Sequence, residues 1–432
     1  MDESPIVALA KQIAADSEAL DLYLKENGLT IPGLDLNGAA DYPKLPTEIQ
    51  ECRQRVLRNS SRLQSLARGP VETIRWATWS FLDSMSLQIL NHFGIASLVP
   101  FDGTITLEEL ETKTSLDPIN LARVLRHAMT NNIFQEPSPG VIAHTPTSRL
   151  LGQDDSLRSW LGFNLEDIFP ASAHVLEALK KHPEATSITR TGFNFANGTV
   201  DKEPMFVTFA KDPQRAKRMA LAMTSLSGGE GYEVAHLVNS YDFSDVDSKQ
   251  GTLVDIGGSH GFACVEIGQK WKHVKFVVQD LQRTIDTAPK PICEDEQVAS
   301  RITLMAHDFF TEQVVKDADV YFLRWIIHNY SDPYAVKILK SLIPALKPGA
   351  KIIINDHCLR EPGSENPFDE KVMRSMDLVM LSLLNAHERT EEQYQALFQA
   401  ADERFVFKGV SRSEGCRMSV IEAVWEPRTE TR

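Results

Sequence analysis

The sequence has few cysteines, no long apolar run and no excess of positive charge. Its 432 residues include five cysteines that are widely spaced and form no Cys-x-x-Cys pair or Cys/His cluster. We therefore expect reduced cysteines and no metal ion. The formal net charge of −14 argues against nucleic acid as a partner. No run of about eighteen apolar residues occurs, and the first residues do not resemble a secretory signal, so we expect a cytoplasmic protein without a membrane partner.

The length predicts two domains, which we place at residues 1–164 and 165–432. Apolar residues recur at helical spacing over residues 5–27 and again over 46–68, with a boundary at Gly69-Pro70. Residues 71–99 are predicted as one long helix with too few polar positions for an exposed surface. Such a helix has to be buried against something large, and we expect a homodimer.

Residues 106–143 have the pattern helix, turn, helix and two short strands, which is typical of a winged helix. Winged helices often bind DNA, but the second helix carries only Arg123, Arg126 and His127 as basic residues. A DNA-binding regulator that senses a small ligand is therefore a rival hypothesis, and the acidic net charge opposes it.

The second half of the chain alternates apolar runs with helical stretches from Thr252 onward. Continuous apolar runs predict parallel strands that are covered on both faces, and we expect them at residues 253–256, 274–278, 320–323 and 351–355. The predicted fold class is α/β, a doubly wound domain preceded by a mostly α-helical, winged-helix-like domain.

A glycine-rich segment follows the first of these strands. Gly257, Gly258 and Gly261 would let the backbone turn tightly and approach a ligand at a helix N-terminus. Asp280 ends the second strand, where a carboxylate can accept hydrogen bonds from both hydroxyls of a ribose. Asp255 suits a ligand with a charged amino group better than a pyrophosphate, which it would repel. The loop alone is also compatible with nicotinamide and flavin cofactors.

Over almost its whole length the chain resembles the S-adenosylmethionine-dependent O-methyltransferases of the plant caffeate and fungal secondary-metabolite type. Five segments match in order, at residues 255–261, 278–281, 306–310, 323–332 and 342–349. Ser259 replaces the third glycine of the family loop, which we expect to cost little if that position does not need a positive φ. The resemblance implies a Rossmann-like methyltransferase domain that binds S-adenosyl-L-methionine through Asp255, Gly257, Gly258, Gly261, Asp280, Leu281, Asp308, Phe309 and Arg324.

Methyl transfer to a hydroxyl requires alignment of the two reactants and removal of a proton, and a histidine suits the second task. The resemblance assigns it to His328, which follows an apolar strand. Asp356 and Glu388 resemble the acids that flank this histidine in the family, where a carboxylate fixes the tautomer of the ring. Asp356 is shorter than the usual glutamate, so its reach is less than that of Glu388. His387 ranks second as a candidate base.

The same resemblance predicts residues that contact the acceptor, namely Trp325, Met376, Met380 and Asn385. The expected acceptor is a phenolic or enolic hydroxyl of a small aromatic or polyketide-like metabolite. One alternative stays open, a relative that retains the cofactor but catalyses a pericyclic or rearrangement step. The presence of His328, Asp356 and Glu388 argues against that alternative.

Overall fold

The computed structural model describes residues 3–34, 38–39, 41–229, 231–365 and 367–427. The chain forms two compact units. One contains the residues up to Pro170 together with Phe209–Ser225 and Glu365–Lys371, and the other contains the remaining segments. Two segments that follow residue 208 thus belong to the first unit. The predicted domain ranges 1–164 and 165–432 stay a prediction.

The first unit begins with four helices, α1 (Pro5–Glu26), α2 (Thr47–Trp79), α3 (Phe81–His92) and α4 (Ile95–Leu98). The prediction of one helix over residues 71–99 is wrong. Within this range α2 ends at Trp79, α3 begins at Phe81, and Gly94 has φ 61°, a conformation that ends a right-handed helix. The kink inside α2 at Gly69, with φ 74° and ψ 172°, agrees with the predicted boundary at Gly69-Pro70. Within the described ranges, no helix combines the length and the apolar character that a bilayer-spanning segment needs.

A small helix-and-sheet module follows in the first unit. It consists of β1 (Thr104–Thr106), α5 (Leu107–Glu111), α6 (Pro118–Met129), β2 (Gln135–Ser138) and β3 (Val141–Ala143), with the strand order β1-β3-β2. Thr106 and Asp117 cap the two helices by accepting main-chain N–H bonds. The unit also holds α7 (Pro146–Gln153), α8 (Asp155–Gly162), the π-helix η1 (Phe163–Ile168) and most of α12 (Pro213–Ser227).

The second unit is built on a seven-stranded sheet with the order β11-β12-β8-β7-β4-β5-β6. The strands are β4 (Thr252–Ile256), β5 (Lys275–Asp280), β6 (Ile302–Ala306), β7 (Val320–Arg324), β8 (Lys351–Asp356), β11 (Phe405–Ser411) and β12 (Ser419–Trp425). The five strands β4 to β8 are parallel, whereas β12 is antiparallel to both β8 and β11. The predicted fold class is confirmed, although β6, β11 and β12 were not identified from the sequence.

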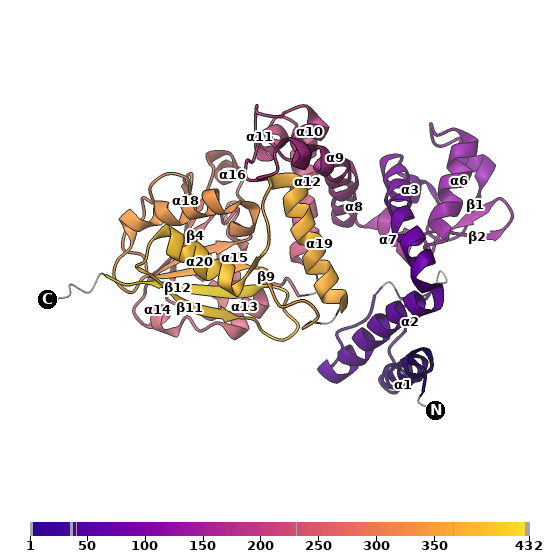
Figure 1. Ribbon diagram of the computed structural model, residues 1–432, viewed down its shortest axis with the longest axis horizontal. Helices are drawn as coiled ribbons and strands as arrows, with labels where there is room; N and C mark the ends of the chain where they lie inside the picture. The colour runs from indigo at the N-terminus through magenta and orange to yellow at the C-terminus, as the bar shows by residue number, and fades with distance from the viewer. Residues whose placement is uncertain (1–2, 35–37, 40, 230, 366, 428–432) are drawn as a thin grey trace. The chain divides into compact units, whose positions relative to one another are not determined.

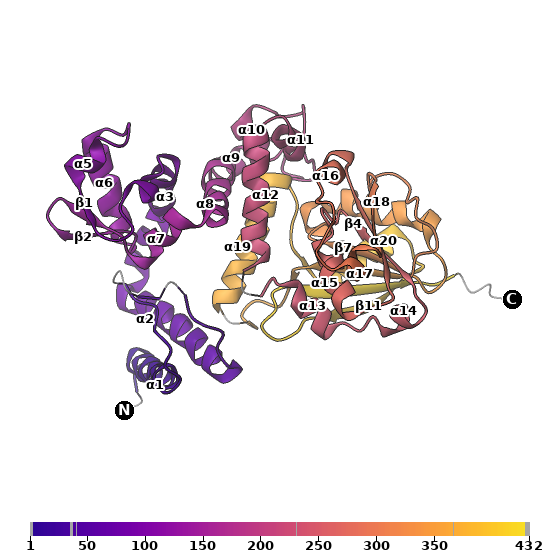
Figure 2. The ribbon, with the colours of Figure 1, turned by 180° about the vertical axis from the view of Figure 1, so that it is seen from behind.

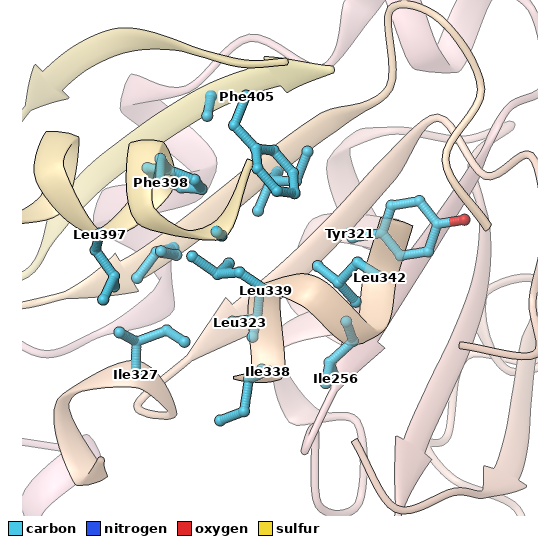
Figure 3. Close-up of a cluster of buried hydrophobic side chains, with 14 of the residues drawn as sticks. Ile256, Tyr321, Leu323, Ile327, Ile338, Leu339, Leu342, Leu397, Phe398 and Phe405 are labelled. Atoms are coloured by element: carbon cyan, nitrogen blue, oxygen red, sulfur yellow. The ribbon is translucent and has the colours of Figure 1, made fainter. Parts of the chain in front are cut away.

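Alternate residues of the central strands are buried on opposite faces of the sheet. Val254 and Leu323 belong to one apolar cluster with α18 (Asp332–Leu342) and α20 (Glu391–Ala401), which lie on the face seen in Figure 1. Leu253 and Phe322 belong to a second cluster with α13 (Val234–Ser240) and α15 (Phe262–Lys270), labelled in the reverse view of Figure 2. In Figure 3 the leucines of α18 and α20 lie among the strand residues of the first cluster. Burial of each such side chain stabilises the fold by about 1.5–3 kcal/mol.

The remaining elements of the chain are short, apart from α9 and α19. They are α9 (Phe169–Lys181), α10 (Gly192–Asn197), α11 (Met205–Ala210), α14 (Ser244–Ser248), α16 (Gln282–Asp286), α17 (Glu296–Ala299), η2 (Ile327–Asn329), η3 (Ile343–Ala345), β9 (Cys358–Leu359), α19 (Pro367–Leu384) and β10 (Arg389–Thr390).

The loop between β4 and α15 is held close to the sheet by its main chain. The N–H groups of Gly257 and Gly258 both donate to the carbonyl oxygen of Gln279, at 2.8 and 3.1 Å. A Cβ atom on Gly258 would lie 2.4 Å from the carboxyl group of Asp255, and one on Gly257 would lie 2.5 Å from Cδ1 of Ile326. A side chain at either position would therefore displace a neighbouring side chain, and the φ of 70° at Gly257 also favours glycine.

Ser259 in the same loop has φ 52°, in the left-handed region. We expected serine to cost little here only if the position did not need a positive φ. The position does need one, and Ser259 is strained, because L-residues with a Cβ are strained in this conformation. The N–H of Ser259 donates to Oδ2 of Asp280 at 3.0 Å, and this bond ties the strained residue to the end of β5.

We predict that Ser259→Gly is more stable than Ser259→Ala by about 1 kcal/mol, because only glycine adopts this backbone conformation without strain. Denaturant unfolding of the two variants, compared with the wild-type protein, measures the difference. Both variants lack the hydroxyl, so the comparison isolates the backbone. Equal unfolding free energies would contradict the prediction.

Candidate active site

The predicted site residues of the second unit gather at one edge of the sheet. The glycine loop follows β4, Asp280 ends β5, and Asp308 lies two residues beyond β6. His328 lies in the turn after β7, and Asp356 ends β8. These strands are parallel, so their carboxyl ends meet at the edge where open α/β sheets bind ligands.

Asp280, Leu281 and Phe309 form the part of this edge next to the glycine loop. Oδ1 of Asp280 accepts the N–H of Leu281 at 2.8 Å, so both carboxylate oxygens are oriented by main-chain donors. Cε1 of Phe309 would lie 3.5 Å from a Cβ on Gly257. A carboxylate, an approachable main chain and an aromatic ring together fit a nucleoside, with the carboxylate on the ribose hydroxyls. Asp308 itself is exposed and accepts the N–H of Phe310 at 2.9 Å.

Asp255 and Arg324, also predicted to bind the cofactor, are buried and bonded to protein groups. Asp255 is 2% exposed and accepts the thiol proton of Cys264 at 3.3 Å between Sγ and Oδ2. Burial raises the pKa of Asp255 to about 7. Arg324 donates to the carbonyl oxygen of Tyr232 and to Oδ1 of Asn355, and burial lowers the pKa of its guanidinium. In this structure both side chains support the loop and the strand ends.

His328 forms a buried pair with Glu388. Its Nδ1 lies 3.0 Å from Oε1 of Glu388, and the two side chains are 6% and 0% exposed. A carboxylate can only accept, so Nδ1 carries the hydrogen. Nε2 has no hydrogen-bond partner among the described residues, and it is the nitrogen that can take up a proton. Burial alone would lower the pKa of His328, but the charge and hydrogen bond of Glu388 outweigh burial, and the pKa is raised.

The turn that carries His328 is fixed from two sides. Asp356 does not reach the imidazole ring through a hydrogen bond, and its Oδ2 instead accepts the main-chain N–H of His328 at 3.0 Å. Burial raises the pKa of Asp356. Arg389 is fully buried and donates to the carbonyl oxygens of Ile327 and Tyr330, at 3.2 and 2.7 Å. The guanidinium therefore clamps the main chain on both sides of His328.

Glu388 is itself held in place by its neighbours. Its main-chain N–H donates to Oδ1 of Asp377 at 2.8 Å. Burial opposes its ionisation, but His328 and His357 together bring its pKa well below the usual range. It is therefore an anion whose hydrogen-bond donors are both imidazoles.

His357 is a site residue that the sequence reasoning missed. It directly follows Asp356, is fully buried, and places its Nδ1 3.3 Å from the same Oε1 of Glu388. The available signal was a histidine immediately beyond an apolar strand that already ended in a predicted site acid. Arg389, next to Glu388, was also assigned no role.

The predicted acceptor residues differ in how they relate to His328. The Trp325 ring lies 4.8 Å from that of His328 and 5.0 Å from that of His357, measured between centroids. Asn385 uses its amide to donate to the carbonyl oxygens of Ser187 and Arg190. On α19, Met380 is buried and Met376 is partly buried.

The second candidate base, His387, has a different partner. Its Nε2 lies 3.0 Å from Oδ1 of Asp332, which also accepts two bonds from Arg389. His387 therefore belongs to a partly exposed ion-pair group. No group of three or more metal-ligating side chains occurs in the described part of the chain.

Comparison with known proteins places this arrangement in a family. The profile of the O-methyltransferase domain matches residues 180–403. The chain is 59% identical to the chlorophenol O-methyltransferase of Trichoderma longibrachiatum, over 98% of this chain and 91% of that protein. It is 36% identical to the O-methyltransferase AMT9 of Alternaria alternata, over 99% of each chain.

A solved structure shares the fold over nearly the whole length. The crystal structure of OxaC in complex with SAH and oxaline superimposes with a TM-score of 0.75 at 23% identity, covering 98% of this chain and 100% of that one. The profile spans more than half of the 432 residues, and the two relatives align along most of their length. The chain is therefore a member of the O-methyltransferase family.

Proposed function

We propose that the protein transfers the methyl group of S-adenosylmethionine to the hydroxyl oxygen of a small phenolic molecule, with His328 as the general base. One observation carries the assignment of the base. His328 is oriented through Nδ1 by a buried carboxylate, while its Nε2 has no hydrogen-bond partner among the described side chains. A histidine held in this way is prepared to accept a proton at one defined atom.

The residues of the sheet edge fit the proposed cofactor. Asp280 would accept the ribose hydroxyls, the main chain at Gly257 and Gly258 would approach the ligand, and Phe309 would lie against the adenine. When bound, S-adenosylmethionine supplies a methyl carbon that is activated by a positively charged sulfur. The SAH complex of OxaC, which has the same fold, supports this choice.

The protein's own contribution is proton removal and alignment. Nε2 of His328 takes the hydroxyl proton, and the anion of Glu388 stabilises the imidazolium that forms. Asp356 and Arg389 hold the turn, so the ring does not shift when it becomes charged. The flat face of Trp325 beside His328 suits an aromatic acceptor.

A phenol is the acceptor class favoured here, and the name of the relative from Trichoderma longibrachiatum supports it.

The pericyclic alternative differs in one measurable respect, because it converts a substrate without consuming cofactor. DNA binding is disfavoured because two of the three basic residues on α6 already have partners in the protein. Arg126 makes two bonds to Glu136, and His127 contacts Ser86.

Two variants separate catalysis from cofactor binding. We predict that His328→Ala binds SAH with nearly wild-type affinity but loses about 10²- to 10⁴-fold in turnover, because the imidazole serves the acceptor. Asp280→Asn should instead weaken SAH binding by about 1.5–3 kcal/mol, because a charge-assisted hydrogen bond is lost. Calorimetry with SAH and transfer of a labelled methyl group to a panel of phenols measure the two effects.

Raising the pH should partly rescue His328→Ala with a phenolic acceptor, whose own ionisation near pH ~10 replaces the base. A His328→Ala enzyme with the wild-type rate would refute the assigned base. Conversion of a substrate by the wild-type enzyme without methyl transfer would favour the pericyclic alternative.

The pH dependence of kcat/KM tests the pair of His328 and Glu388. Only unprotonated His328 is a base, and its pKa is raised, so activity should be lost as the pH falls through a value above 6.5. Glu388→Gln removes the charge that raises this pKa. We therefore predict that its acid limb moves to lower pH by about one unit or more. An acid limb that stays in place would show that Glu388 does not act on the base.

We also propose a homodimer formed through the helices α2 and α3. Their large apolar side chains are 40–69% exposed in the single chain, namely Val71, Ile74, Trp76, Trp79, Phe81 and Met85. A monomer would leave this surface in water, which is unusual for a soluble protein.

Light scattering at micromolar concentration tests the dimer. The wild-type protein should have twice the monomer mass, and the double variant Ile74→Asp/Trp79→Asp should have the monomer mass. Val314→Asp, at an exposed apolar position in the second unit, is the matched control and should remain dimeric. A monomeric wild-type protein would contradict the proposal.

A further inference from the structure

We propose that His357 is a positioning residue that shares Glu388 with the catalytic base and limits the pull of this carboxylate on His328. The inference rests on the proposed function, in which His328 accepts the proton of the acceptor. It adds a second imidazole to the buried group that controls that proton.

The two imidazoles bond to one oxygen of Glu388. Oε1 lies 3.0 Å from Nδ1 of His328 and 3.3 Å from Nδ1 of His357. The other oxygen, Oε2, is buried without a partner among the described residues. Both donors therefore compete for the electron density of a single oxygen, although the carboxylate has two.

The hydrogen-bond partner of His357 places a hydrogen on its Nδ1. Glu388 can only accept, so Nδ1 of His357 must donate. Its Nε2 is buried and has no partner within the described ranges, so the bond to Glu388 is its one side-chain hydrogen bond there. His357 is thus a fixed hydrogen-bond donor.

The ring of His357 is also held in position by its neighbours. It packs edge-on to Trp325 at 5.0 Å and lies 5.7 Å from Tyr232, measured between ring centroids. Its main-chain carbonyl oxygen accepts the hydroxyl of Tyr394 at 3.0 Å. The donor therefore keeps its direction when the charge of His328 changes.

The second hydrogen bond has a defined effect on His328. A donor to Oε1 stabilises the negative charge of Glu388 and weakens the attraction between this charge and the imidazolium. His357 should therefore lower the pH at which His328 becomes unprotonated, relative to a Glu388 bonded to His328 alone. Burial lowers the pKa of His328 and Glu388 raises it. Because His357 weakens the effect of Glu388, His328 would be available as a base closer to neutral pH.

The other ionisable groups around the pair come from several elements and stay unchanged in the variants below. They are Asp356 of β8, Asp377 of α19, Asp332 of α18, Arg389 of β10 and Tyr394 of α20. A difference between the His357 variants therefore reports on the one donor that they change.

The test compares His357→Leu with His357→Asn. Leucine removes the donor, whereas asparagine carries an N–H group at the same number of bonds from Cα as Nδ1. We expect the acid limb of kcat/KM in His357→Leu to move to higher pH by roughly half to one unit, with the high-pH plateau within a few-fold of the wild type. His357→Asn should keep the wild-type profile. The shift is opposite in direction to that expected for Glu388→Gln.

A plateau that falls in His357→Leu while the acid limb stays in place would mean a merely structural role and would overturn the proposal. Should the leucine variant not fold, His357→Phe, which keeps a ring but has no donor, replaces it against His357→Asn with the same expected direction.

Histidine-selective NMR titration adds a readout that does not depend on turnover. It should show the midpoint of His328 raised in His357→Leu, and an unchanged midpoint would overturn the proposal. If His328→Ala retained the wild-type rate, the proposed function would fail, whereas this titration would still decide whether His357 acts on His328.

Discussion

The hydrogen bond between Glu388 and His328 is the interaction on which the proposed chemistry depends. It works only because it is buried, since water would screen the carboxylate and compete for Nδ1. Burying an anion is costly unless it is paired, and Glu388 is paired with two imidazoles. Arg389 and Asp356 extend this support to the main chain of the turn. The residues around His328 therefore form one connected polar group at the sheet edge.

The sequence predicted the strands that appear as runs of apolar residues and missed those whose runs polar residues interrupt, such as β12 with Glu422. β4, β7 and β8 are buried along almost their whole length, so each appears as a continuous apolar run. β6 is only partly buried and has no such pattern. The helix breaks near Ser80 and Gly94 depend on local backbone geometry. A glycine or serine in an apolar helical stretch does not by itself reveal a break.

The residues of the candidate site also divide into those that the sequence predicts and those that it does not. Residues that directly follow a strand, such as Asp280 and His328, were predictable because parallel strands bring their ends to one edge. The bond of His357 to Glu388 joins positions 31 residues apart, and that of Arg389 to Ile327 joins positions 62 apart. No spacing rule predicts such contacts, because they depend on how α19 returns the chain to the sheet. The left-handed conformation of Ser259 was also not predictable from the sequence.

The interleaving of the two units affects how the chain can fold during synthesis. The first unit includes Phe209–Ser225 and Glu365–Lys371, so it lacks a part until the ribosome has added residue 371. Domains that are continuous in sequence can complete their folding in order from the N-terminus. Here the first unit also needs Glu365–Lys371, which emerges after all five parallel strands of the second unit. Completion of both units therefore falls late in translation, and a stalled chain would present an unfinished first unit to chaperones.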